Sequence, residues 1–315
     1  MIPATSARPA PSAAILAGRC RHDGRRTLRR RSVLAAYLSR LDVEAEEPSV
    51  DALARIHRAH VERVPYETFW IHLGERWGIE PTSSMERIAR TTRGGYCFQL
   101  NGALAGLLTA LGYEATLHVA GVHGDAGAAA AMGNHAAVVV HSLPTEANPS
   151  GRWYVDAGLG DVLHEPLPLR AWRGSDAHAS YELAPVSDGV GHWRLGARSP
   201  GGVAVVTVDA RPTAIGAFRA RHLFNATSGE SSFARTVTAQ RRHATGTDVL
   251  RGCVLTRRDG TLVSSDTLTS CATWLAALDD VFGMRLDVGR PVLDDLWARV
   301  QASHEEWLAT TATAA

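Results

Sequence analysis

The spacing of apolar residues changes twice along the chain. Between residues 32 and 112, apolar positions recur at helical spacing in four stretches, at 33–38, 50–64, about 84–93 and 100–111. Ser49 is expected to cap the second of these helices, and Gly112 to end the last. Residues 32–112 are therefore predicted to form a mainly helical segment.

After Gly112 the apolar positions alternate with polar ones, which is typical of strands. Strands are expected at 115–119, 136–140, 153–155, 181–183, 193–195 and 203–208. Several short strands in succession favour a small antiparallel barrel or sandwich over residues 113–211.

From about Pro212 the pattern is mixed. It predicts a short helix at 218–223, strands at 234–240 and 250–255, a turn at Asp259-Gly260, and helices at 270–282 and 293–308. Residues 1–31 are rich in Pro, Ala, Ser and Arg, so a disordered tail is expected there.

Composition limits the possible functions of this 315-residue chain. The net charge of +1 gives no reason to propose a nucleic acid as partner. All 33 basic side chains are arginine, which excludes a lysine Schiff base and a P-loop lysine. The four cysteines form no CxxC pair, so neither a disulfide framework nor a zinc site is expected, and a reducing cytoplasm fits. No apolar run is long enough to span a bilayer.

The stretch Arg93-Gly94-Gly95-Tyr96-Cys97-Phe98-Gln99-Leu100-Asn101 places a cysteine between a glycine pair and an apolar helix. Cys97 is thus expected in the first turn of that helix, where unpaired N–H groups and the helix dipole favour a thiolate. The glycines allow close approach of the backbone to a reacting group. A buried structural cysteine is the alternative, and Cys253 and Cys271 are interpreted in that way, as core residues.

A histidine and an aspartate at the ends of two expected strands could face this cysteine. His135 directly precedes the strand at 136–140, and Asp156 follows the strand at 153–155. His135 would accept the thiol proton, Asp156 would orient the ring, and Cys97 would attack a carbonyl carbon. Taken singly, each of the two is more often an ordinary loop or turn residue. His57 and His60, which lack acidic or cysteine neighbours, are interpreted as packed or surface histidines.

These segments resemble those of the arylamine N-acetyltransferases. That family carries Arg-Gly-Gly-x-Cys-x-Glu-x-Asn, then a histidine before an apolar strand, then Asp-Val-Gly-Phe-Gly. The corresponding segments in this chain are residues 93–101, His135 with the strand after it, and Asp156-Ala157-Gly158-Leu159-Gly160. The resemblance extends over roughly residues 32–285 and includes residues 57–68 and 225–233.

The resemblance implies an α+β fold with a catalytic core like that of cysteine proteases. A helical domain over 32–112 would carry Cys97, a β-barrel over 113–211 would carry His135 and Asp156, and 212–315 would form an α/β lid. It also implies ping-pong transfer of an acetyl group from acetyl-CoA, through a Cys97 thioester, to an aromatic amine or hydrazine. Acetyl-CoA is then a substrate, and no permanently bound cofactor, metal, nucleic acid or membrane is expected. By the same resemblance, Asn134, Leu159 and Phe233 would line the substrate cleft.

Two departures from the family pattern bear on the substrate. Gln99 stands where the family has glutamate, so an ion pair of that residue with an N-terminal arginine would be lost or would become a neutral hydrogen bond. Leu159 replaces a phenylalanine, which removes an aromatic ring from the expected acceptor pocket. Two alternatives share the fold: an amide synthase that closes a macrolactam from a carrier-bound acyl chain, and a non-catalytic relative. The motifs do not resemble those of thiol proteases or transglutaminases.

Overall fold

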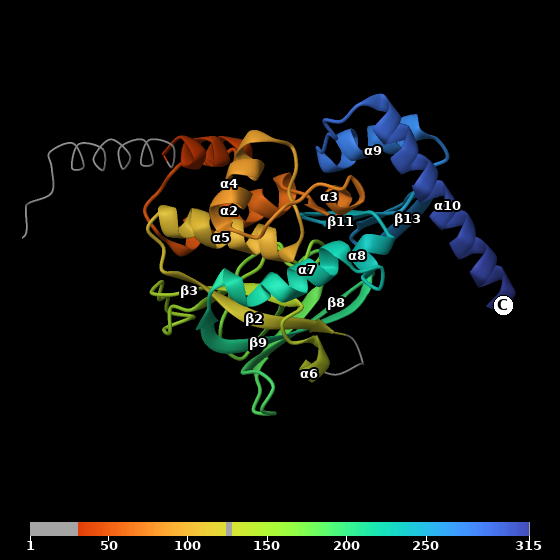
Figure 1. Ribbon diagram of the computed structural model, residues 1–315. Helices are drawn as coiled ribbons and strands as arrows, with labels where there is room; N and C mark the ends of the chain where they lie inside the picture. Colours follow the sequence, from red (N-terminus) through yellow and green to blue (C-terminus); the bar gives the residue numbers. More distant parts are fainter. Residues whose placement is uncertain (1–30, 124–127, 315) are drawn as a thin grey trace, which may run out of the picture.

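The computed structural model describes residues 31–123 and 128–314 (Figure 1). Residues 1–30 of the expected disordered tail lie outside the described residues, and residue 31 is already helical. In the part of the chain that is described, no helix combines the length and apolar character needed to cross a membrane.

The N-terminal segment is helical, as its pattern predicts. Its elements are a helix over residues 31–41, α2 (Val50–Arg63), β1 (Tyr66–Glu67), α3 (Phe69–His72), α4 (Pro81–Arg90) and α5 (Cys97–Ala110). Ser49 caps α2 as expected, because its side chain accepts a hydrogen bond from the Ala52 N–H. The chain leaves α5 through Gly112, whose φ of 92° suits a residue without a side chain.

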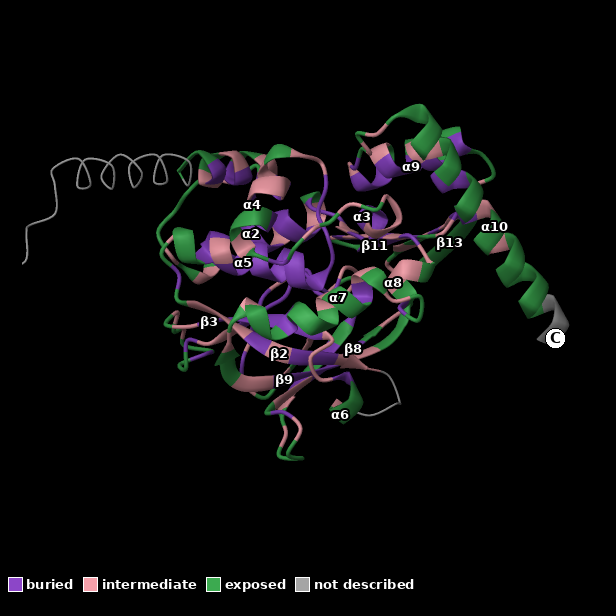
Figure 2. Ribbon diagram, viewed as in Figure 1, coloured by how far each residue is buried: buried purple, intermediate pink, exposed green. Residues whose placement is uncertain are grey.

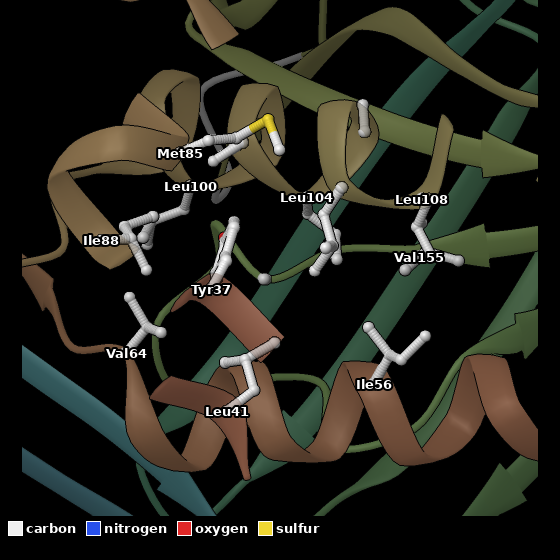
Figure 3. Packing of buried hydrophobic residues seen from close by; sticks show 14 of the residues in the cluster. Tyr37, Leu41, Ile56, Val64, Met85, Ile88, Leu100, Leu104, Leu108 and Val155 are labelled. Carbon is white, nitrogen blue, oxygen red and sulfur yellow. The ribbon is translucent and has the colours of Figure 1, made fainter. Parts of the chain in front are cut away.

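The helices enclose an apolar core that also reaches the sheet below them. Figure 3 shows Leu100, Leu104 and Leu108 of α5 pointing into this core. Ile56 of α2, Tyr37 of the first helix and Ile88 of α4 lie around them. Val155, next to Asp156 in the sequence, packs in the same cluster. The core therefore joins the helix that begins at Cys97 to the strand that precedes Asp156.

The middle of the chain forms one antiparallel sheet of eight strands, in the order β5-β4-β3-β2-β9-β8-β7-β6. The strands are β2 (Ala115–His123), β3 (His135–Val140), β4 (Trp153–Val155), β5 (Leu167–Pro168), β6 (Trp172–Ser175), β7 (Ser180–Pro185), β8 (Trp193–Ser199) and β9 (Gly202–Thr213). Only residues 169–171 separate the two edge strands in the sequence, so the sheet curls nearly into a barrel. The short helix α6 (Ala128–Ala131) lies between β2 and β3.

The C-terminal part adds a second sheet, in the order β1-β10-β11-β12-β13, so β1 from the helical segment forms one edge of it. The elements are η1 (Ile215–Phe218), α7 (Arg219–Thr227), α8 (Ser232–Arg235), β10 (Thr238–His243), β11 (Gly246–Arg251), β12 (Val254–Asp259), β13 (Leu262–Thr267), α9 (Cys271–Phe282) and α10 (Arg290–Ala314). Figure 2 shows that α10 is mostly exposed between residues 302 and 311. With helices, a barrel-like sheet and this α/β part, the expected fold class is confirmed.

Two expected strands were wrong in detail. The stretch Leu250–Leu255 is a hairpin, because β11 ends at Arg251 and Gly252 turns the chain with a φ of 60°. Residues 234–240 begin with the end of α8, and β10 starts only at Thr238. The remaining expected turn, at Asp259-Gly260, joins β12 to β13.

Candidate active site

Cys97 lies at the first residue of α5 and is 4% exposed. Tyr96 is the N-cap, and its N–H donates a hydrogen bond of 3.0 Å to Gln99 Oε1 one turn later. Gln99 Nε2 donates to the Gly78 carbonyl at 3.3 Å. The glutamine thus makes neutral hydrogen bonds to the backbone at this position.

The glycine pair before Cys97 is packed against the link between α2 and β1. A Cβ atom on Gly94 would lie 1.9 Å from the Pro65 carbonyl oxygen. Gly95 has a φ of 135°, and its carbonyl accepts the Glu67 N–H at 2.9 Å. Only glycine fits at either position without displacing the backbone. The pair therefore sets where α5 begins, and with it the position of the Cys97 side chain.

Cys97, His135 and Asp156 come together, as expected, where the start of α5 meets β3 and β4. His135 is the first residue of β3, and its Nε2 lies 2.7 Å from Asp156 Oδ2. The Cys97 thiol lies close enough to His135 to help raise the pKa of that imidazole, and its sulfur is 3.8 Å from the Asn134 carbonyl oxygen. Because Nε2 faces Asp156, the Nδ1 atom is left for the sulfur. All three side chains are buried.

The electrostatics of the trio favour a protonated histidine. Burial alone would lower the pKa of His135, but the Asp156 carboxylate and Cys97 outweigh it and raise that pKa to about 10. Burial opposes the negative charge on Asp156, yet the pKa of this carboxyl is lowered by His135 and by hydrogen bonds from Asn101 and Tyr154. At neutral pH the pair is therefore an imidazolium and a carboxylate.

Four further groups hold Asp156 in place. Its Oδ1 accepts hydrogen bonds from Asn101 Nδ2 at 2.7 Å and from the Gly158 N–H at 2.9 Å. Tyr154 donates its hydroxyl to Oδ2 at 2.5 Å. The backbone N–H of Asp156 donates to His57 Nε2 at 3.3 Å. The Asn101, Gly158 and Tyr154 donors satisfy the buried carboxylate, since an unsatisfied charge inside a protein is costly.

None of these supporting roles was predicted from the sequence, although signals were present. Asn101 follows Cys97 by four residues, so both lie on one face of α5. Tyr154 precedes Asp156 by two residues, which is the repeat of side chains on one face of a strand. His57 and His60 are both buried and packed, in line with their interpretation. Burial lowers the pKa of His57, and its neutral ring can accept from the Asp156 N–H.

A cleft of about 470 Å³ opens in front of Cys97 and His135. All three residues expected to line it do so, but they contribute differently. Leu159 presents an aliphatic side chain, and the Phe233 ring stacks on Tyr96 with centroids 5.3 Å apart. The Asn134 amide already bonds the Val122 N–H and carbonyl, both at 2.9 Å, so it braces the turn between β2 and β3.

Other candidate chemistry is not found in the part of the chain that is described. No group of three or more His, Cys, Asp or Glu side chains there is arranged to hold a metal ion. Cys253 and Cys271 are buried and unpaired by disulfides, in agreement with their interpretation as core residues.

Known proteins resemble this chain in sequence and in fold. The family model described as N-acetyltransferase matches residues 49–290. Over 149 residues the chain is 30% identical to arylamine N-acetyltransferase 1 of Oryctolagus cuniculus, covering 45% of this chain and 48% of that protein. The chain belongs to the arylamine N-acetyltransferase family. The matched region spans about half the length of the curated relatives.

Solved structures of arylamine N-acetyltransferases have the same fold over most of their length. The Mycobacterium smegmatis enzyme superimposes with a TM-score of 0.74 at 26% identity, covering 85% of this chain and 97% of that one. The Salmonella typhimurium enzyme gives a TM-score of 0.73 at 23% identity, covering 85% of this chain and 98% of that one.

Proposed function

We propose that this chain is an arylamine N-acetyltransferase, which takes an acetyl group from acetyl-CoA onto Cys97 and passes it to an aromatic amine or hydrazine. The observation that carries the proposal is that Cys97 lies beside His135, which is hydrogen-bonded to Asp156, at the edge of an open cleft. Membership of the family supports the same reaction, since its members in the comparisons bear that name.

In the resting site, His135 holds a proton, and the Cys97 sulfur is the group to which we assign the nucleophilic attack. The raised pKa of His135, about 10, keeps the imidazolium present at neutral pH. Asp156 stabilises this cation through its contact with Nε2. A thiolate is a strong nucleophile toward a thioester, and the leaving group is also a thiol, so the exchange needs no stronger activation.

The first half-reaction moves the acetyl group to the protein. The Cys97 sulfur attacks the thioester carbonyl, a bond forms between Cys97 Sγ and the acetyl carbon, and the bond to the CoA sulfur breaks. The proton on His135 passes to the departing CoA thiolate. The histidine is then neutral, and with the sulfur acylated it has lost the negative neighbour that helped to hold its proton.

The second half-reaction uses that neutral ring as a base. The amine nitrogen attacks the acetyl carbon, His135 takes the nitrogen's proton, and the bond to Cys97 Sγ breaks to regenerate the thiolate and imidazolium. In both halves the carbonyl oxygen gains negative charge. The Cys97 N–H, which makes no backbone or side-chain hydrogen bond with the described residues, is the donor we assign to it.

The cleft lining fits a flat aromatic acceptor. Tyr66 and Phe233 contribute aromatic rings and Leu159 an aliphatic wall. Gly158 lets this wall come close, because a Cβ there would lie 2.7 Å from the Cys97 Cα atom. An amine attached to an aromatic ring can stack against these side chains while its nitrogen reaches the thioester.

Transfer of acetyl from acetyl-CoA to an aromatic amine or hydrazine is the test. Cys97→Ser is expected to abolish transfer, because a hydroxyl is far less acidic than a thiol. Cys271→Ser, the same change in a cysteine at the start of α9 outside this cleft, serves as control and should remain active. Full activity in the Cys97→Ser protein would refute the proposal.

A further inference from the structure

Gln240 of β10 lines the Cys97 cleft but has no part in the proposed reaction. It is paired directly with Tyr66 of β1, the edge strand of the second sheet, and Tyr66 lines the cleft too. Side chains of directly paired residues leave a sheet on the same face, with Cβ atoms about 4.5–5.5 Å apart. The second sheet therefore presents an amide and a phenol side by side to the space in front of Cys97.

The Tyr66 phenol lies near the reacting sulfur. Burial raises the pKa of this phenol well above its ordinary value, and the nearby Cys97 raises it further. The hydroxyl therefore keeps its proton at neutral pH, so it can donate a hydrogen bond as well as accept one.

Neither polar group is occupied by the protein itself. Within residues 31–123 and 128–314, the Gln240 amide and the Tyr66 hydroxyl make no side-chain hydrogen bond. The Asn134 amide in the same cleft differs, because it bonds the backbone of Val122. Gln240 and Tyr66 are both half-buried and line the cleft, so their polar groups are open to a molecule that enters it.

The Gln240 side chain is held against the loop that follows Asp156. A Cβ atom on Gly160 would lie 2.0 Å from Gln240 Oε1 and 3.2 Å from Gln240 Cβ, so the side chain packs along this glycine. Gly160 directly follows Leu159, the aliphatic wall of the cleft. A side chain that is already packed loses little further freedom when it binds a ligand.

Arg242 fixes the same loop at a second point. It lies two residues after Gln240, on the same face of β10, and is fully buried. Its Nε donates to the Val162 carbonyl at 3.1 Å, and its Nη2 donates to Asp176 Oδ2 at 2.6 Å. The wall formed by Leu159, Gly160 and Gln240 is therefore anchored to β10 and is pre-organised.

We propose that Gln240 and Tyr66 select the acceptor by hydrogen-bonding a neutral polar substituent on its aromatic ring. The matching substituent both donates and accepts, as a carboxamide does, because the amide and the phenol each offer both kinds of group. The inference rests on the proposed function for the acceptor being an aromatic amine. It adds two specificity-determining residues from the second sheet.

A hydrogen bond at this place discriminates between acceptors of the same shape. Apolar walls distinguish such molecules weakly. An acceptor with an apolar substituent would cover the Gln240 amide and the Tyr66 hydroxyl without bonding either, and a covered polar group without a partner costs free energy. The carboxamide avoids that cost.

The test compares para-aminobenzamide with para-isopropylaniline, which has a similar shape and an apolar substituent. For each protein the ratio of kcat/KM for the amide to that for the isopropyl compound is measured with acetyl-CoA as donor. We expect Gln240→Met and Tyr66→Phe each to lower this ratio by about tenfold, through KM for the amide. Differences in the reactivity of the two amines cancel between variants, and loss of folded protein lowers both rates equally.

Gln301→Met and Tyr113→Phe are the matched controls. They make the same two changes in residues that do not line the cleft, and both should keep the wild-type ratio. A wild-type ratio in both Gln240→Met and Tyr66→Phe would overturn the inference. An equal fall in the control variants would do so too, because the effect would then not depend on the cleft.

A charged acceptor identifies the competing anchor. Arg221 and Arg235 also line the cleft and would suit a carboxylate substituent. The ratio for para-aminobenzoate over para-isopropylaniline is therefore measured in Arg235→Gln. A fall there, together with an unaltered carboxamide ratio in Gln240→Met, would assign selection to the arginines and contradict the proposal.

Protection of Cys97 from iodoacetamide separates this inference from the proposed function, since it needs no acyl donor. The concentration of para-aminobenzamide that halves the alkylation rate should rise about tenfold in Gln240→Met and stay the same in Gln301→Met. If acetyl-CoA acetylates neither amine, the proposed function fails, yet this shift still supports recognition by Gln240. Equal protection of Gln240→Met and the wild-type chain, or no protection of either, would overturn the inference.

Discussion

Tyr154 donates its hydroxyl hydrogen to Asp156 Oδ2 at 2.5 Å, on the same oxygen that faces His135 Nε2 at 2.7 Å. The tyrosine and the histidine therefore share one acceptor atom in a buried site. Tyr154 helps to keep the carboxylate charged, since its hydrogen bond lowers the pKa of Asp156. It also fixes the direction from which Asp156 approaches the imidazole.

Tyr154→Phe tests this relationship with little change in packing. Losing a hydrogen bond to a charged group is expected to lower the free energy of unfolding by about 1.5–3 kcal/mol. Acetyl transfer should decrease, but less than in Asp156→Asn, which disturbs the tautomer of His135 itself. Chemical denaturation and steady-state rates measure the two effects. Unaltered stability and an unaltered pH profile would show that this hydrogen bond contributes nothing.

A buried ion pair joins Arg93, the residue before the glycine pair, to Glu67 of β1. Arg93 donates two hydrogen bonds to the carboxylate, at 3.2 and 3.1 Å. Arg93→Gln would leave Glu67 charged and buried, and we expect a loss of about 3–5 kcal/mol in unfolding free energy. Arg290→Gln, which breaks an exposed pair with Asp294, should cost only about 0.5 kcal/mol or less. Equal small losses in the two variants would contradict this account.

Gly94→Ala should damage both stability and activity. The new Cβ would lie 1.9 Å from the Pro65 carbonyl oxygen, so the loop before Cys97 must shift. Overpacking of this kind costs about 1–3 kcal/mol. Gly216→Ala is the control, because a Cβ there meets no atom within 4 Å. Thermal melting and Cys97 alkylation rates follow the change, and a fully reactive Gly94→Ala protein would argue against a tight fit.

The raised pKa of His135 predicts the pH range over which its imidazole stays protonated. Its pKa of about 10 lies above the ordinary value of 6.5, so the folded chain keeps this proton across a range in which a free histidine has lost it. Nitrogen-15 NMR of the imidazole should show an imidazolium at pH 8. In Cys97→Ala the pKa should fall, because Cys97 helps to raise it. A neutral ring at pH 8 in the wild-type chain would contradict the ion pair.

Local patterns predicted the parts of the fold that depend on neighbours in sequence. The leucines of α5 and the glycines before it give the helix and its start, and Ser49 gives the start of α2. The β11–β12 hairpin was missed because Leu250 to Leu255 reads as one strand, and only the positive φ of Gly252 reveals the turn.

The candidate site was predicted unevenly for a related reason. Cys97, His135 and Asp156 occur in recognisable motifs, whereas the role of Asn101 depends on how closely α5 approaches the end of β4. Such a distance is set by packing of the whole core around Leu104 and Val155, which no local pattern encodes.

The mass of the intact protein after brief incubation with acetyl-CoA, in the absence of an acceptor, tests the central claim most directly. We predict a gain of one acetyl group in the wild-type chain and none in Cys97→Ala. Addition of an aromatic amine should then remove the acetyl group. No gain in the wild-type chain would contradict the account. If Cys97 is still readily alkylated in that case, the donor is a different acyl thioester, as in an amide synthase; if it is inert, the chain is a non-catalytic relative.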